Sequence, residues 1–178
     1  MRNELNKEIT IADVGIQYDA QCKRVLGQKV ILAWILRRTV GAFADMDIDS
    51  ICRCIEGEPD ISTVRVNPGE TNSMRVEGLS TEDKVPDEGA VYYDIRFRAY
   101  EPRENGYIKV IVNVEAQKSF YPGYEIVTRG IFYAARMISA QLGVEFMASE
   151  YDKLKKVYSI WLCMDAPKKI GNAISEYH

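Results

Sequence analysis

Two β-rich runs of equal length constrain the fold more than any other feature of this sequence. They are AVYYDIRFRAY, from Ala90 to Tyr100, and YIKVIVNVEAQ, from Tyr107 to Gln117, with only EPRENG between them. Branched and aromatic runs that flank a short segment rich in turn residues indicate a β-hairpin with a longer loop. We expect Tyr100 to pair with Tyr107, a register in which paired residue numbers sum to about 207.

This hairpin predicts one apolar face and one charged face. The first face carries only apolar side chains and must lie in the core: Tyr93, Ile95, Phe97, Val110, Val112 and Val114. The second face carries Tyr92, Asp94, Arg96 and Arg98 opposite Glu115, Asn113, Ile111 and Lys109, followed by Gln117. A slip of one residue would mix polar and apolar groups on both faces, so the pattern fixes which residues share a face.

Helices are expected before and after the hairpin. Ala20 to Phe43 has apolar residues at helical spacing behind Asp19, which suits an N-cap, and a shorter helix covers Ile48 to Glu56 behind Asp47 or Asp49. A third helix is predicted from Tyr124 to Gln141, with a buried stripe made of Val127, Ile131, Ala134 and Ile138.

A last strand and a long irregular segment complete the predicted domain. Lys156 to Met164 has apolar residues on both faces, as an interior strand does. Glu58 to Gly89 is rich in Pro, Gly, Glu, Ser and Thr, with STVRV and SMRVEG as short strand-like pieces. The order helix, helix, strand, strand, helix, strand predicts a single α/β (α+β) domain over residues 1–178.

The histidine and cysteine content excludes several kinds of catalytic centre. The single histidine is the terminal His178, so a Ser-His-Asp or Cys-His centre and a zinc site built on His lack their imidazole. Cys52 and Cys54 form C-x-C with no second pair to complete a metal site, which favours reduced intracellular thiols. Acid–base or metal chemistry must therefore use carboxylates, Lys, Tyr or Arg.

Charge and hydropathy favour a soluble cytoplasmic protein. The chain has 23 Lys and Arg against 26 Asp and Glu, which gives a net charge of −3. This charge argues against a generally basic protein that coats nucleic acid, but it allows a local basic cleft. Its N-terminus lacks the apolar stretch of a secretory signal. The longest apolar run, Val30 to Leu36, is far shorter than the roughly 18 residues of a membrane span.

Asp94, Glu115 and Gln117 form the candidate site on the charged face of the hairpin. Two carboxylates on adjacent strands, together with the main-chain carbonyl of Ala116, are the ligands that a hard cation such as Mg²⁺ takes. A bound metal would acidify a water molecule and stabilise charge on a phosphate, chemistry that needs no histidine. The alternative is that carboxylates and arginines make cross-strand ion pairs on a solvated surface.

These residues resemble a known family pattern. Asp94 followed by Glu115-Ala116-Gln117 at a strand end is similar to the D…(D/E)-x-K signature of the PD-(D/E)XK nuclease superfamily, most closely to its recombination-promoting nuclease / putative transposase branch, where E-x-Q commonly replaces E-x-K. The segments that carry the resemblance are YDAQCKRVLG, YYDIRFRAY, VNVEAQ, YEIVTRGIFYAARMISAQ and VYSIWLCMDAP.

The resemblance implies a restriction-endonuclease-like core, a small mixed β-sheet flanked by helices, and a metal-dependent DNA endonuclease. Asp94, Glu115 and the carbonyl of Ala116 would bind Mg²⁺, with Mn²⁺ as a substitute, and Gln117 would orient the attacking water. The implied partner is DNA, with a homo-oligomer as an open alternative and no membrane partner. Because family members usually continue in a helical C-terminal part, a form truncated at GNAISEYH is expected.

Other residues have two interpretations each. Asp19 and Lys23 are accessory candidates, although Asp19 also suits a helix N-cap. Arg129, Tyr133 and Arg136 form a stripe that would hold phosphates or would simply be a solvated helix face. Arg96 would bind phosphate or pair with the carboxylates.

Two departures from the family pattern bear on activity. Tyr93 replaces the Pro of the signature, and Gln117 can orient water but cannot act as acid or base. Lys118 is the adjacent lysine, but it alternates to the other face of the strand. The alternative function is therefore a catalytically inactive remnant of the nuclease fold that binds DNA or protein.

Overall fold

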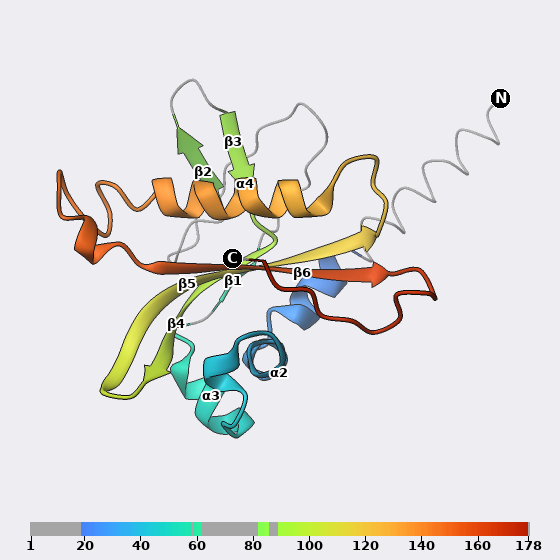
Figure 1. Ribbon diagram of the computed structural model, residues 1–178, viewed down its shortest axis with the longest axis horizontal. Coiled ribbons are helices and arrows are strands. Elements are labelled where there is room, and N and C mark those ends of the chain that lie inside the picture. The colour runs from blue at the N-terminus through green and yellow to red at the C-terminus, as the bar shows by residue number, and fades with distance from the viewer. Residues whose placement is uncertain (1–18, 58, 62–81, 86–88, 178) are drawn as a thin grey trace.

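The computed structural model describes residues 19–57, 59–61, 82–85 and 89–177 (Figure 1). Residues 19–26 are helical. The elements that follow are α2 (Lys29–Thr39), η1 (Gly41–Phe43), α3 (Ile48–Cys54), β1 (Asp60–Ile61), β2 (Glu82–Val85), β3 (Gly89–Tyr92), β4 (Ile95–Arg103), β5 (Gly106–Ser119), α4 (Ile126–Ser139), η2 (Tyr151–Lys153) and β6 (Lys156–Asp165). This confirms a mixed α/β chain with the predicted order of main elements.

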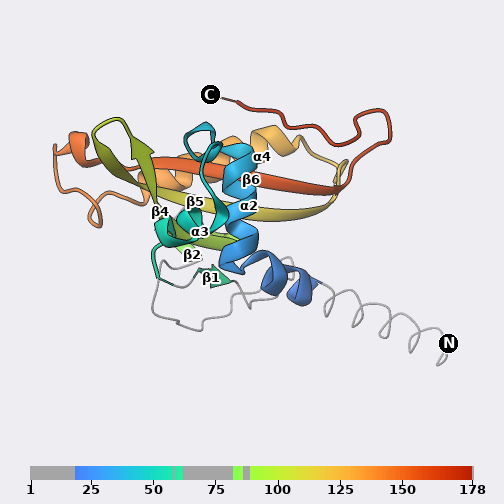
Figure 2. The ribbon, with the colours of Figure 1, turned by 90° about the horizontal axis from the view of Figure 1, so that it is seen from below.

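A mixed sheet separates two helical layers. The strand order is β1-β4-β5-β6, antiparallel except for the parallel pair β5 and β6. Helix α4 connects these two parallel strands and covers one face, while α2 and α3 cover the other (Figure 1). Figure 2 shows α2 crossing the sheet on the side opposite α4. In the described sheet β6 is an edge strand, so the predicted interior position was wrong; helices on both sides explain its apolar residues.

The hairpin of β4 and β5 has the predicted faces in a different register. Tyr100 pairs with Lys109 and Arg103 with Gly106, so paired numbers sum to 209 rather than about 207. The expected loop is therefore a tight turn at Glu104-Asn105, followed by Gly106 at φ 126°, a backbone conformation that suits glycine. Because the shift is an even number of residues, each side chain within the paired strands β4 and β5 keeps its predicted face.

The apolar face forms the main core with one exception. Ile95, Phe97, Val110, Val112 and Val114 pack with residues of α2 and α3, as predicted. Tyr93 is also fully buried but lies on the α4 side, in a cluster with Ile111, Tyr133 and Met137. The predicted strand from Ala90 to Tyr100 is interrupted at Tyr93-Asp94, and β3 pairs with β2 in a separate two-stranded sheet. Because the strand is interrupted there, the alternation of faces that placed Tyr93 in the main core does not continue as far as Tyr93.

The segment before the hairpin is described only in part. Of the predicted irregular stretch, β1, β2 and the start of β3 are described, whereas STVRV (62–66) and SMRVEG (73–78) lie outside the described residues.

The first predicted helix is divided, and the second begins where expected. Helical residues 19–26 end at Gly27-Gln28, before α2, and Phe43 belongs to the short helix η1. Glycine is a poor helix former, which agrees with the break at Gly27. Asp47 is the N-cap of α3, and its side chain accepts a hydrogen bond from Ser50 N at 2.8 Å.

Helix α4 packs on the sheet through a different stripe of side chains from the apolar stripe that periodicity predicts. Its buried residues are Tyr133, Arg136 and Met137, while Val127, Ile131 and Ile138 are exposed. The prediction was wrong because the sheet face beneath α4 is itself aromatic and polar, with Tyr93, Arg96, Asn113 and Trp161 on that side. Apolar spacing alone does not show which of two stripes meets such a surface.

Two further findings concern membrane spans and cysteines. Within the described ranges no helix is both long enough and apolar enough to cross a membrane. All four cysteines are free thiols, as expected.

Near the turn of the hairpin, the buried carboxylate of Glu101 binds side chains of β4 and β6. Glu101 is 1% exposed, and Tyr158 on β6 donates its hydroxyl to Glu101 Oε2 at 2.6 Å. Arg103 and Lys156 form ion pairs with Glu101 Oε1 at 2.7 and 3.4 Å. Burial first, and then the hydrogen bond to Glu101, raise the pKa of Tyr158, so its hydroxyl stays protonated and donates.

Tyr158→Phe should lower the free energy of unfolding by about 1–2 kcal/mol, because a hydrogen bond to a buried carboxylate is lost. Denaturant unfolding measures this, with Tyr107→Phe as the matched control since Tyr107 is 63% exposed. Equal stabilities for Tyr158→Phe and the wild type would contradict the role of this bond.

Candidate functional site

Asp94 and Glu115 are tied to each other through the backbone. The Asp94 amide donates to Glu115 Oε1 at 3.0 Å, and the Ala116 amide donates to Asp94 Oδ2 at 2.9 Å. The ladder begins with the pair Ile95 and Val114, so Asp94 and Glu115 are the next residues on the two segments, rather than diagonal neighbours as predicted. The bend before β4 and the middle of β5 therefore bring the two predicted carboxylates together.

Glu115 is the more deeply buried of the pair. It is 4% exposed, and Asn113 Nδ2 also donates to its Oε1 at 3.0 Å. Burial, followed by the charge of Asp94, raises the pKa of Glu115 to about 8, although the Asp94 amide, Asn113 and Arg129 act in the opposite direction. Without a metal ion, this environment therefore favours the protonated form of Glu115.

A lysine from the N-terminal helical residues completes the cluster. Lys23 Nζ lies 2.8 Å from Asp94 Oδ1 and 2.9 Å from Asp19 Oδ2. Burial lowers the pKa of Lys23, but the interactions with Asp94 and Asp19 outweigh burial and raise it overall. Asp19 is itself helical, so it stands inside the helix rather than in the N-cap position before it. Both accessory candidates are therefore at the site.

Gln117 is not directed at the carboxylates. Its Nε2 donates to the carbonyl of Ser119 at 2.8 Å, along its own strand. Lys118 is exposed beside it. The structure therefore places neither residue of the Gln117-Lys118 pair in contact with Asp94 or Glu115.

The predicted arginine–tyrosine stripe of α4 faces the sheet. Arg129 Nη2 donates to the Tyr133 hydroxyl at 2.7 Å, and Arg129 also donates to the Tyr124 hydroxyl. Its guanidinium lies over three rings, with centroids 5.4 Å away for Tyr124, 5.0 Å for Tyr133 and 5.2 Å for Trp161. The interpretation of this stripe as a solvated helix face was wrong, because α4 packs this side on the sheet.

Tyr124, Tyr133 and Trp161 form an aromatic cage around the Arg129 guanidinium. Tyr133 and Arg129 are close enough to the two carboxylates to interact with them electrostatically. Burial raises the pKa of Tyr133, Arg129 lowers it, and the charges of Glu115 and Asp94 raise it. Arg129 in turn lowers the pKa of Glu115. Arg129 and Tyr133 are therefore neighbours of the candidate site, with the guanidinium already engaged by hydroxyls and rings.

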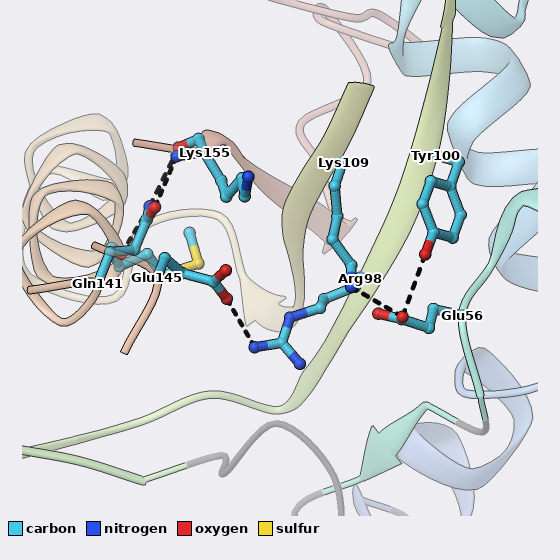
Figure 3. Close-up of polar contacts among 8 residues, drawn as sticks. Glu56, Arg98, Tyr100, Lys109, Gln141, Glu145 and Lys155 are labelled. Atoms are coloured by element: carbon cyan, nitrogen blue, oxygen red, sulfur yellow. Dashed lines mark hydrogen bonds and ion pairs between the residues drawn. The ribbon is translucent and has the colours of Figure 1, made fainter. Parts of the chain in front are cut away.

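The other charged residues of the hairpin face are covered or paired elsewhere. Arg96 and Arg136 are 5% and 4% exposed, and the Arg96 guanidinium lies 5.1 Å from the Tyr93 ring centroid. Arg98 pairs with Glu145 at 2.7 Å and Lys109 pairs with Glu56 at 2.8 Å, and both contacts are drawn in Figure 3. The predicted solvated surface of cross-strand ion pairs is therefore wrong for Arg98 and Lys109, whose carboxylate partners lie outside the hairpin.

Sequence reasoning missed Tyr124 and Trp161 as parts of the cage. The signal was Gly130, next to Arg129 inside a helix, where glycine often marks close approach. A Cβ at Gly130 would lie 3.2 Å from Trp161 Nε1, so the glycine lets β6 bring the indole under α4.

The potential ligand set is limited to a few oxygens. Among the residues that the structure describes, no group of three or more His, Cys, Asp or Glu side chains is arranged to hold a metal ion. Such a group was not expected, because the predicted ligands are two carboxylates and a main-chain carbonyl.

Comparisons with protein-family models, curated proteins and solved structures find no match to this chain. The resemblance to the PD-(D/E)XK superfamily therefore stays a prediction based on the sequence segments quoted above.

Proposed function

We propose that this chain is a Mg²⁺-dependent DNA endonuclease with a restriction-endonuclease-like core, related to transposase-associated nucleases. The observation that supports it best is the reciprocal tie between Asp94 and Glu115, with a lysine ammonium on Asp94 Oδ1. The cytoplasmic location and the oligomeric state stay predictions.

The donor set fits a hard divalent cation. Asp94 and Glu115 offer carboxylate oxygens from adjacent strands, the type of ligand that Mg²⁺ and Mn²⁺ prefer. Asp94 Oδ1 faces the ammonium of Lys23 at 2.8 Å, so a positive charge already lies against this oxygen. Mg²⁺ would be held by Asp94, Glu115 and the carbonyl of Ala116, and would supply an acidified water and charge neutralisation at a phosphate.

The remaining residues have distinct tasks in this proposal. Arg129 and Tyr133 provide a positive, hydrogen-bonding wall beside the carboxylates, suited to phosphate oxygens once the Arg129 hydrogen bonds to the tyrosines exchange. Gln117 would orient the attacking water, which requires its amide to leave the Ser119 carbonyl. Arg96 and Arg136 are buried, so in this proposal they do not touch DNA.

A plasmid-nicking assay with Mg²⁺ or Mn²⁺ tests the proposal. Wild-type protein should nick supercoiled DNA, and Asp94→Ala or Glu115→Ala should each reduce the rate by about 10²-fold or more, as loss of a charge-stabilising group does. Glu150→Ala is the matched control, because Glu150 is an exposed glutamate outside the site. Nicking that survives both substitutions would contradict the proposed site.

One observation favours the alternative, a nuclease-fold remnant that binds DNA or protein without cutting. Gln117 is bonded to Ser119, and no lysine occupies its position in the signature. In that case the wild type would bind DNA in a mobility-shift assay without metal but would not nick it in the presence of Mn²⁺.

A further inference from the structure

We infer that Lys23 is an exchangeable counter-ion of this site, which occupies Asp94 when metal is absent and competes with Mg²⁺ for the same oxygen. This inference rests on the metal site of the proposed function and adds a regulatory step to it. The site would be closed by its own lysine at low metal concentration and opened by the cation that replaces it.

The two oxygens of Asp94 have different partners. Oδ2 accepts the Ala116 amide at 2.9 Å, a backbone bond that fixes the carboxylate to β5. Oδ1 is the oxygen held by Lys23 at 2.8 Å. On Glu115, the two recorded donors, the Asp94 amide and Asn113, both use Oε1, so neither occupies Oε2. The Asp94 oxygen that carries no backbone bond is therefore the one that Lys23 holds, and a cation that joins Asp94 to Glu115 through it would displace the ammonium.

An ammonium and a divalent cation exclude each other at one oxygen. Like charges a few ångströms apart repel strongly in a partly buried site, where screening by water is reduced. The Lys23 side chain is 11% exposed and that of Asp94 is 19% exposed, so this pair is such a site. Metal binding therefore requires the ammonium to leave Asp94 Oδ1.

Lys23 has a second acceptor that makes this departure easy. Its Nζ also reaches Asp19 Oδ2 at 2.9 Å, one helical turn earlier, and the Asp19 side chain is 56% exposed. A lysine ammonium on its flexible four-carbon stem can turn toward Asp19 and water without moving the backbone. Because Lys23 belongs to the N-terminal helical residues and not to the sheet, its movement leaves the tie between Asp94 and Glu115 in place.

Calorimetric titration with Mn²⁺ tests the inference. Removing the competing charge in Lys23→Met should tighten Mn²⁺ binding about tenfold, the order expected for one partly buried ion pair, whereas Lys23→Arg should stay within about twofold of the wild type because it keeps the charge. Lys109→Met is the matched control for net charge, since Lys109 also pairs with a glutamate, Glu56, at 2.8 Å but away from the site. It should bind Mn²⁺ as the wild type does.

Unchanged or weaker Mn²⁺ binding by Lys23→Met, or equal tightening by Lys109→Met, would overturn the inference. If Lys23→Met does not fold, Lys23→Gln is used; failure of both to fold would also overturn it, because a counter-ion that leaves on metal binding cannot be required for the fold.

The outcomes separate this inference from the proposed function. Tighter binding by Lys23→Met in a protein that never nicks DNA supports the counter-ion and contradicts the nuclease. Nicking by the wild type with equal metal affinity in Lys23→Met supports the nuclease and contradicts the counter-ion. Absence of Mn²⁺ binding in the wild type and in every variant contradicts both.

Discussion

Glu115→Gln is expected to raise the free energy of unfolding at pH 9 in metal-free buffer, by roughly 2 kcal/mol or more. The wild-type carboxylate is 4% exposed and must be charged at that pH beside Asp94. A glutamine keeps an acceptor oxygen for the Asp94 amide and for Asn113, the two donors that reach Glu115 Oε1 at 3.0 Å. The substitution therefore removes a buried charge and retains the hydrogen bonds that this oxygen accepts.

The same residue sets the direction of the pH dependence. Its pKa is about 8 in the folded chain against 4.5 for an unperturbed glutamate, so the folded state holds the extra proton between these values. The wild-type free energy of unfolding should therefore be highest, with respect to this group, below pH 4.5 and should fall as pH rises through about 8. Glu115→Gln should lose this fall.

Urea unfolding at a series of pH values from 5 to 9 measures both effects, over a range that spans most of the window between the two pKa values. Glu145→Gln is the contrasting control, because that glutamate pairs with Arg98 at 2.7 Å and its neutralisation should lower stability. Added Mn²⁺ should stabilise the wild type at pH 9 but not Glu115→Gln. A wild-type stability that does not change between pH 6 and 9 would show that Glu115 is ionised throughout, contrary to the expectation.

The hairpin shows which part of a strand pairing can be predicted from sequence. Apolar alternation decides which residues share a face, and five of the six predicted core positions on these strands are buried under α2 and α3. The absolute register depends on the turn, and the sequence pattern assigned Pro102 and Arg103 to a loop although both remain in β4. Alternation cannot detect an error of two residues, because such a shift leaves every face unchanged.

The part of the candidate site that lies on the hairpin could be predicted from the sequence, whereas the contacts that depend on tertiary packing could not. Asp94 and Glu115 meet because they lie on neighbouring strands, which the hairpin pattern predicts. The contact between Lys23 and Asp94 depends on how the N-terminal helix is placed against the sheet, which no periodicity encodes. The orientation of α4 was missed for a related reason: Tyr133 and Arg136 are polar by composition but are buried by the surface they meet.

The clearest residue that the sequence did not reveal is a second glutamine, Gln141, just after α4. It is 1% exposed, and its side chain spans the gap between the end of α4 and the start of β6 (Figure 3). The Lys155 amide donates to Gln141 Oε1 at 2.7 Å, and Gln141 Nε2 donates to the carbonyls of Lys155 and Met137 at 3.0 and 3.2 Å. Because Gln141 ends a predicted helix, the pattern gave no reason to separate it from other terminal polar residues.

Gln141→Leu should lower the free energy of unfolding by about 2–4 kcal/mol, because an apolar side chain of similar size leaves the Lys155 amide and carbonyl without their partner. Gln117→Leu is the matched control: Gln117 makes one exposed bond to Ser119, so the same substitution should change stability by less than about 0.5 kcal/mol. Denaturant unfolding of both variants measures the difference. Similar costs at the two positions would show that the Gln141 bridge does not hold α4 to β6.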